Sequence, residues 1–298
     1  MGYTGHESFY LRDKWTSKGL KGIEENPRFL SDVKEASEKS GLGVNMVKSL
    51  RYWLRAMELT EAKDKQEVFT KMGSLVYSVD RLLQKNEIVA ILHYHLVRNH
   101  NDLTTVFYWF FNIYKETIAQ RKDIENSFKT WVKHNDPKQV SEKTLESAVG
   151  VLIQQYTKKA IEDDPENTIF SPFAKLNLLK IEPSGEGNSN IRKVSPEIEQ
   201  IGLAPLYYIL LMYAAKKEVE LISLDEIVNE NLLWGKVFNL TRNKIIEALN
   251  KLTSHKKYPI EYVRTNNLDN IRVPKIEPFE YLCFEMELKR KEQHFNGV

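Results

Sequence analysis

His6 and Glu7 stand side by side near the N-terminus, in the stretch GHESFYLR. An imidazole and a carboxylate can together act as general acid and base, or serve as metal ligands. The same pair can instead cap a helix or anchor the terminus, because neighbours in sequence need not converge on a substrate. We name His6 and Glu7 as the candidate catalytic residues and leave the structural interpretation open.

Other residue types that could do chemistry give no further signature. His93 and His95 have the spacing of metal ligands on a strand, but the surrounding pattern is helical and would point the two rings to different faces. We therefore expect His93 in the core. The sequence contains no phosphate-binding glycine loop, dinucleotide-binding pattern, nucleophile elbow or zinc-ligand spacing, so motifs alone name no reaction.

A purely cationic helix face is the strongest local signal. Residues 41–56, GLGVNMVKSLRYWLRA, contain three cations and no acid. Solvated helix faces usually mix charges of both signs, so this one favours contact with the phosphates of DNA, with a protein-binding or idle face as the alternative. The helix in this stretch would be the recognition helix of a helix-turn-helix, with its polar arc turned toward the groove. The predicted DNA-binding residues on this arc are Asn45, Lys48, Ser49, Arg51, Tyr52 and Arg55.

Residues 200–280 repeat the same outline more weakly, as three helices followed by two alternating strands around an Asn-Asn turn. Glu247 dilutes the positive charge of the third helix, and many winged helices serve only for dimerisation or docking. DNA contact and docking are therefore evenly matched here. The candidate DNA-binding residues of this module are Arg242, Asn243, Lys244, Lys256 and Lys257.

The elements that would position these residues are mainly α-helical. The pattern predicts two winged-helix modules, each a helix-turn-helix plus a β-hairpin, flanking a helical and aromatic-rich middle region. The predicted divisions are an N-terminal module over residues 1–80, a middle domain over 81–180, a loop or linker rich in Pro, Gly, Ser and Asn over 181–197, and a C-terminal module over 198–298.

Composition restricts the class of protein. The chain has 298 residues, of which 42% are hydrophobic and 28% charged, and a net charge of only +2, so a nucleic-acid partner must be recognised by local patches. A single cysteine excludes a disulfide framework and a cysteine-based zinc site. We see no signal peptide and no apolar run long enough for a membrane span, and expect a cytoplasmic protein without membrane contact.

Several stretches together resemble one known family. GHESFYLRDKW, GLGVNMVKSLRYWL, LHYHLVRN, FYWFFN and LLWGKVFNLT appear in the order typical of the SspB-like family of bacterial proteins, formerly a family of unknown function. The family usually has a lysine before the Asn-Met-Val run, where this chain has Val44, so one expected phosphate contact is missing. The matching positions are Gly5, His6, Glu7, Phe9, Arg12, Asn45, Met46, Val47, Arg51, Tyr52 and Trp53.

The resemblance implies a place in a bacterial DNA phosphorothioation system, in which sulfur replaces a non-bridging phosphate oxygen as part of anti-phage defence. Proteins of this family are understood to nick DNA and to work with a cysteine desulfurase, an ATPase and an ATP pyrophosphatase. Double-stranded DNA is therefore the expected partner, and a divalent metal, Mg²⁺ or Mn²⁺, is expected only if the chain is a nickase. The sequence does not decide whether the chain forms a homodimer.

A second hypothesis belongs to a different class. Two winged helices around a helical body would also suit a non-catalytic transcriptional regulator, or a scaffold that delivers partner enzymes to DNA. Strand cleavage rests on the resemblance alone, whereas DNA binding rests on the resemblance and on the cationic helix face. The enzymatic assignment, a metal-dependent DNA-nicking endonuclease, is accordingly left undecided by the sequence.

Overall fold

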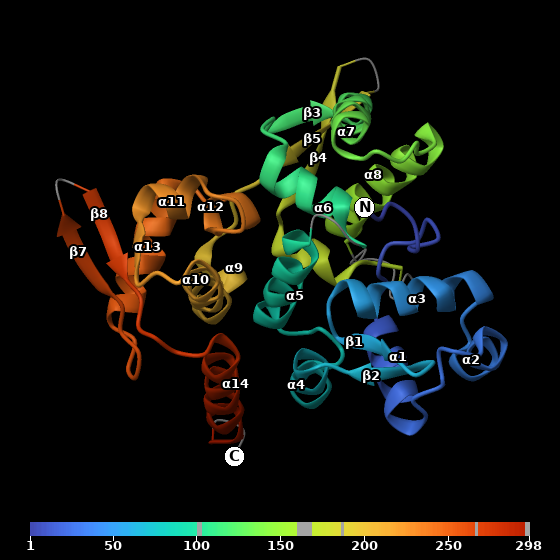
Figure 1. Cartoon of the computed structure of the whole chain (residues 1–298), viewed down its shortest axis with the longest axis horizontal. Coiled ribbons are helices and arrows are strands. Elements are labelled where there is room, and N and C mark those ends of the chain that lie inside the picture. Colours follow the sequence, from blue (N-terminus) through green and yellow to red (C-terminus); the bar gives the residue numbers. More distant parts are fainter. Residues whose placement is uncertain (100–102, 160–168, 186–187, 266–267, 296–298) are drawn as a thin grey trace. The chain divides into compact units, whose positions relative to one another are not determined.

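The computed structural model describes residues 1–99, 103–159, 169–185, 188–265 and 268–295, and the chain divides into two compact units, Met1–Val194 and Ser195–Val298. Both units are mainly helical with small antiparallel sheets, as predicted (Figure 1). The predicted boundary at residue 80, between an N-terminal module and a middle domain within the first unit, stays a prediction. Among the described residues, no helix has the length and hydrophobicity needed to cross a bilayer.

The first unit begins with three helices, a β-hairpin and a fourth helix, of which the second and third helices and the hairpin follow the helix-turn-helix and β-hairpin order that the sequence predicts. Asp32 caps the second helix by accepting hydrogen bonds from the backbone N–H groups of Lys34 and Glu35. The elements are α1 (Trp15–Glu25), α2 (Val33–Ser40), α3 (Val44–Ala56), β1 (Thr60–Lys63), β2 (Gln66–Phe69) and α4 (Lys71–Asp80).

Local backbone requirements fix the hairpin and the helix after it. Asp64 and Lys65 have φ values of 50° and 62°, the left-handed conformation that a two-residue hairpin turn demands. Strand β1 then pairs with β2, with Thr60 opposite Phe69. Gly73 allows α4 to approach this region closely, because a Cβ there would lie 1.9 Å from the carbonyl oxygen of Leu59.

The rest of the first unit is a helical body with a three-stranded sheet. The strand order is β3-β5-β4, so the predicted loop or linker over residues 181–197 is wrong: it contains the end of β4 and all of β5. The predicted helical region after residue 105 likewise includes a π-helical turn and a strand. The elements are α5 (Asn86–Arg98), α6 (Thr105–Tyr108), the π-helical turn η1 (Trp109–Ile113), β3 (Ile118–Gln120), α7 (Arg121–Asn135), α8 (Glu142–Thr157), the 3₁₀ turn η2 (Pro172–Leu176), β4 (Leu179–Ser184) and β5 (Asn188–Lys193).

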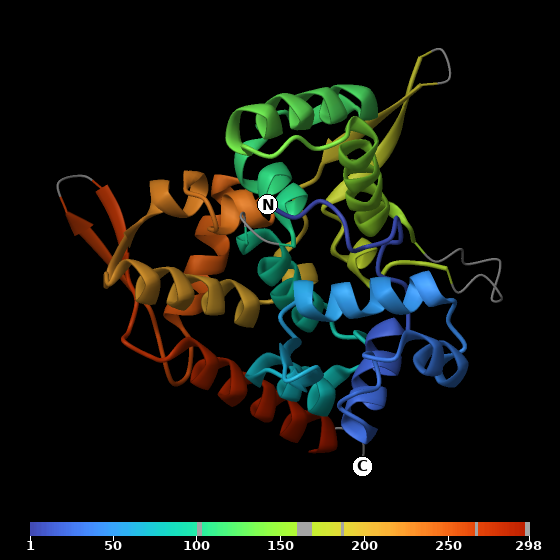
Figure 2. The same ribbon diagram turned by 45° about the vertical axis from the view of Figure 1, so that its right-hand side comes forward.

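The N-terminal segment, residues 1–12, joins the two parts of this unit. Figure 2 shows it running between α3 and α8. On the α3 side, the indole N–H of Trp53 donates to the carbonyl of Phe9 at 3.1 Å. On the α8 side, the backbone N–H of Leu11 donates to Oε1 of Gln155 at 2.8 Å. Both contacts are largely buried, so the segment is a structural part of the unit.

The second unit has its own core and a three-stranded sheet in the order β6-β8-β7. Ser223 caps the helix that follows it in a capping box with Glu226. The predicted Asn-Asn turn lies outside the described residues, but the strands on either side of it pair antiparallel. The elements are α9 (Ile198–Ile201), α10 (Leu203–Lys217), β6 (Leu221–Ser223), α11 (Leu224–Asn229), α12 (Trp234–Val237), α13 (Arg242–Thr253), β7 (Glu261–Thr265), β8 (Leu268–Arg272) and α14 (Pro278–Phe295).

Candidate nucleic-acid interface and N-terminal cavity

Fewer side chains of α3 are exposed to solvent than its helical wheel predicts. Its apolar side is buried as expected, with Leu50, Trp53 and Leu54 fully enclosed. At the surface, Asn45 and Lys48 are exposed, and the Lys48 ammonium lies 3.5 Å from the Asn45 side-chain oxygen. Arg51 is half-buried, and its guanidinium donates to the carbonyl of Leu30 at 3.2 Å, which leaves other N–H groups for a ligand.

Ser49 and Tyr52 lie beneath the surface, which corrects the prediction that they face a DNA groove. Their exposed fractions are 0% and 5%. The Tyr52 hydroxyl donates to the carbonyl of Leu103 at 2.8 Å, and its ring packs edge-on against His6. The helical wheel assigns the whole polar arc to solvent, but the N-terminal segment covers the part that contains Ser49 and Tyr52.

Arg55 is held by an ion pair, so its role as a phosphate ligand stays a prediction. Its Nε donates to Glu67 Oε2 at 3.1 Å, and its Nη2 donates to the other carboxylate oxygen. Glu67 is only 2% exposed and also accepts from the Thr60 hydroxyl at 3.3 Å. The carboxylate that neutralises the Arg55 charge on α3 therefore comes from strand β2, and it could not be recognised from the helix sequence.

His6 and Glu7 lie on a sharply bent loop in which several residues adopt left-handed conformations. Gly5 has a φ of 94°, and a Cβ there would lie 2.7 Å from the Tyr52 ring. Glu7 and Ser8 have φ values of 47° and 61°. Such strained backbone is maintained only where the surrounding structure fixes it, and it clusters at functional sites.

The His6 imidazole is buried and neutral, with an exposed fraction of 3%. Burial lowers its pKa to about 4, against a smaller opposing effect of the Tyr3 backbone. Nδ1 accepts a hydrogen bond from the backbone N–H of Ser8 at 3.1 Å, so the ring proton resides on Nε2. His6 consequently anchors the loop and offers no free lone pair for proton abstraction.

The loop and α8 line a cavity of about 610 Å³ that is open to solvent. Glu7 is exposed there, and Ser8 forms a hydroxyl–hydroxyl contact of 3.0 Å with Ser147. Lys143 brings a positive charge from the first turn of α8. Within the described residues, no hydrogen bond joins His6 to Glu7, so they do not form the acid–base pair that their adjacency suggests. The lining residues are Tyr3, Thr4, Gly5, His6, Glu7, Ser8, Lys143, Thr144 and Ser147.

In the second unit, two predicted DNA ligands are already engaged. Arg242 pairs with Asp225. The Lys244 ammonium donates to the carbonyls of Ser195 and Pro196 at 2.9 and 3.0 Å and also pairs with Glu197. Each cation would have to leave its acid to reach a phosphate, so DNA contact by both residues stays a prediction.

The remaining candidates of the second unit stay accessible. Asn243, Lys256 and Lys257 are exposed. The Lys257 ammonium lies 4.0 Å from the centre of the Phe284 ring and 4.8 Å from that of Tyr258, so a cation–π contact positions it at the surface.

Two buried histidines lie on α5, as core residues rather than metal ligands. His93 is within 2.7 Å of the Tyr156 hydroxyl, and His95 contacts Glu58 through Nδ1 at 2.9 Å. The Glu58 carboxylate also accepts from Arg98 Nε at 2.8 Å. Burial would raise the pKa of Glu58, but the hydrogen bonds from His95 and Arg98 outweigh it and lower the pKa to about 2.

The network of Glu58, His95 and Arg98 could not be predicted from the sequence, because Glu58 lies far from the other two residues in the chain. It fixes the turn between α3 and β1, where Glu58 has a φ of 56°. Glu58 and His95 are 37 residues apart, and no periodic pattern links them. Among the residues that the structure describes, no group of three His, Cys, Asp or Glu side chains is placed to hold a metal ion.

The fold of the chain is similar to that of two solved structures. A comparison with curated proteins finds no match. A magnesium ion-bound crystal structure of SspB matches with a TM-score of 0.82 and 22% identity, covering 97% of this chain and 87% of that chain. A second SspB crystal structure matches with a TM-score of 0.81 and 23% identity over the same shares. The resemblance to the SspB-like family is thus confirmed, and at these identities it establishes the fold.

The sequence also matches a family model along nearly its whole length. The matched region is residues 3–283, which includes the N-terminal loop, α3 and parts of both units. The model is that of DUF4007, a family described as proteins of unknown function. The chain therefore belongs to the DUF4007 family.

Proposed function

We propose that this chain is a DNA-binding subunit of a bacterial DNA phosphorothioation system and that it nicks one strand of duplex DNA. The observation that carries the proposal is the agreement of fold with SspB over 97% of the chain. The motif resemblance in the N-terminal loop and α3 supports it independently. Its working partners would be a cysteine desulfurase, an ATPase and an ATP pyrophosphatase.

The proposed DNA-binding element is a winged helix made of α1, α2, α3 and the β1–β2 hairpin. In this type of module the second helix of the helix-turn-helix enters the major groove. Lys48 and Arg51 would approach phosphates, and Asn45, at the first turn of α3, would lie nearest the base edges. Ser49 and Tyr52 are buried and would not reach DNA directly, and Arg55 would contact a phosphate only on leaving its ion pair with Glu67.

The second unit would add phosphate contacts through a second winged helix. Lys256 and Lys257 are its accessible cations, next to the β7–β8 hairpin, and Asn243 lies at the start of α13. Because Arg242 and Lys244 are paired, this contribution would be smaller than the sequence suggests. These contacts supply affinity without sequence information.

Strand cleavage is proposed at the N-terminal cavity. Glu7 is the accessible carboxylate, and Lys143 and the hydroxyl groups around it suit a phosphodiester. In hydrolysis, water attacks phosphorus and the carboxylate accepts a proton of the water, while the bond to the leaving sugar oxygen breaks and that oxygen takes up a proton from solvent. His6 would act as a positioning residue that holds the loop.

A divalent metal does not fit the described residues as a protein-only site. One SspB crystal structure is magnesium ion-bound. Here, the described part of the chain offers no cluster of three ligating side chains, and Mg²⁺ commonly takes only one or two carboxylates together with substrate phosphates. We accordingly derive no step through Mg²⁺ or Mn²⁺.

The direct test of the phosphorothioation role is genetic. Deleting the gene from its host should remove phosphorothioate-linked dinucleotides from nuclease-digested genomic DNA, as measured by mass spectrometry, and a plasmid copy should restore them. Unchanged phosphorothioate content would overturn the proposal. Specific binding of the purified chain to one palindromic duplex, without strand cleavage at any metal concentration, would instead support the transcriptional regulator or scaffold.

A further inference from the structure

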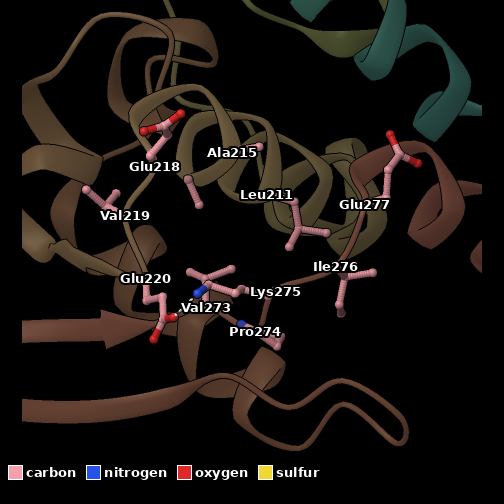
Figure 3. A pocket seen from close by; sticks show the side chains of 11 residues that line it. Leu211, Ala215, Glu218, Val219, Glu220, Val273, Pro274, Lys275, Ile276 and Glu277 are labelled. Carbon is pink, nitrogen blue, oxygen red and sulfur yellow. Dashed lines mark ion pairs between the residues drawn. The ribbon is translucent and has the colours of Figure 1, made fainter.

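A groove of about 540 Å³ lies on the second unit, outside every residue discussed for DNA binding. It runs between the C-terminal end of α10 and the segment that joins β8 to α14 (Figure 3). Its apolar lining comes from both elements, with Leu211 on one side and Val273, Pro274 and Ile276 on the other.

The groove has a buried apolar floor, with Leu211 and Val273 each 2% exposed, and apolar side chains at its mouth that are exposed to solvent. Leu211, Ala214, Ala215 and Glu218 follow the spacing of one helical face, which leaves Lys216 and Lys217 on other faces of the chain. The nearby side chains of Val219 and Leu221 are 39% and 41% exposed, so no described part of the chain covers them fully. An apolar groove with exposed apolar side chains at its mouth and a polar rim is typical of an interaction site.

The rim of the groove is acidic. Glu218, Glu220 and Glu277 line it together with a single cation, Lys275, which gives a net charge of −2. Lys275 pairs with Glu220 at 2.7 Å. Figure 3 shows Glu218 and Glu277 on opposite sides of Leu211, so a carboxylate stands at either end of the apolar floor. The C-terminal end of the α10 dipole adds partial negative charge.

This combination of charge and hydrophobicity selects the occupant. An acidic rim repels DNA and anionic lipid headgroups. A second copy of the chain docking through the same face would oppose like charges. We propose that the groove docks a short cationic segment of a partner protein, in which an apolar side chain enters the groove and flanking Lys or Arg side chains meet Glu218 and Glu277. The site is separate from the DNA-binding residues and does not depend on the proposed function.

The test uses the full chain with labelled Ile, Leu and Val methyl groups and the probe peptide acetyl-Arg-Leu-Arg-Leu-Arg-amide, followed by NMR. We expect saturable shifts at Leu211, Val219, Val273 and Ile276 that weaken with salt. E218Q and E277Q should each weaken binding by about two- to five-fold, the range of an exposed ion pair. Gln retains an acceptor for the Glu280 N–H that Glu277 binds. E287Q, which changes an exposed acid of α14 outside the groove, is the matched control.

Several results would overturn the proposal. One is the absence of saturable shifts at the four groove residues in a spectrum that shows a folded protein. Another is equal binding of the peptide in which Glu replaces Arg, because the acidic rim would then have no role. Equal affinity of E218Q, E277Q and E287Q would also contradict it. Finally, Val219 methyl groups that a soluble paramagnetic probe cannot reach in the free protein would mean that the chain covers the groove itself, because this side chain is 39% exposed in the structure.

Discussion

Replacing Lys48 and Arg51 with alanine should make DNA binding less sensitive to salt. Each cation that pairs with a duplex phosphate adds about 0.9 to the steepness of log K against log salt, so removing two such cations should reduce it by about 1.8. Between 50 and 200 mM salt this difference amounts to a roughly tenfold change in the ratio of the two affinities. The affinity loss should therefore be about ten times larger at the lower salt concentration.

The fold should survive this double substitution. Lys48 is exposed, and exposed substitutions usually change stability by about 0.5 kcal/mol or less. Replacing Arg51 removes the hydrogen bond to the Leu30 carbonyl, a net contribution of about 1 kcal/mol. Thermal melting of the variant should thus remain close to that of the natural chain.

The assay is fluorescence anisotropy with a random-sequence duplex of about 30 base pairs, repeated across the salt range that separates the slopes. The matched control replaces Lys115 and Lys180, two exposed cations beside β3 and on β4, and removes the same charge from another part of the unit. If the α3 variant and this control have the same slope, the cationic face of α3 does not bind DNA. An acidic partner protein would then be the better hypothesis for it.

Three further predictions concern the first unit. Arg55→Ala should lower its melting temperature by roughly 4–10 °C, because it leaves the 2% exposed Glu67 unpaired at a cost of about 2–3 kcal/mol, and adding Glu67→Gln should restore most of the loss; a double variant no better than the single would contradict this. Glu58, with its pKa lowered from 4.5 to about 2, stabilises the fold above pH 4.5 and loses that contribution as the pH falls toward 2, so Glu58→Gln should flatten urea-unfolding stability over this window, and an unchanged pH profile would refute it. Burial lowers the pKa of His6 from 6.5 to about 4, so its contribution of about 3 kcal/mol is present above pH 6.5 and lost as the pH falls toward 4; His6→Asn should remove this pH dependence, whereas equal acid sensitivity would argue against a buried neutral imidazole.

Elements with local signals were predictable from the sequence. The amphipathic pattern of α3 and the pairing of the strands on either side of the Asn-Asn turn depend on residues within a few positions of one another. Those signals suffice because helix caps and tight hairpin turns place requirements on single side chains and φ values. The order of helices and hairpin in each module followed from them.

Features formed by distant segments were not predictable. Strand β3 pairs with β5, with Ala119 opposite Ile191, and the Pro-, Gly- and Ser-rich composition of the second hairpin suggested a loop. The candidate site was affected in the same way. The wheel placed Ser49 and Tyr52 in solvent because it carries no information about the N-terminal segment, and it left Arg55 unpaired because Glu67 belongs to another element.

Strand cleavage itself can be measured as relaxation of supercoiled plasmid by the purified chain with Mg²⁺ or Mn²⁺, with and without chelator. We expect conversion to open circles, loss of conversion in Glu7→Gln, and unchanged DNA affinity and melting temperature for that variant. Glu287→Gln, an exposed acid on α14, is the control and should nick as the natural chain does. Intact plasmid at micromolar protein, or nicking by Glu7→Gln at the natural rate, would show that this cavity does not cleave DNA.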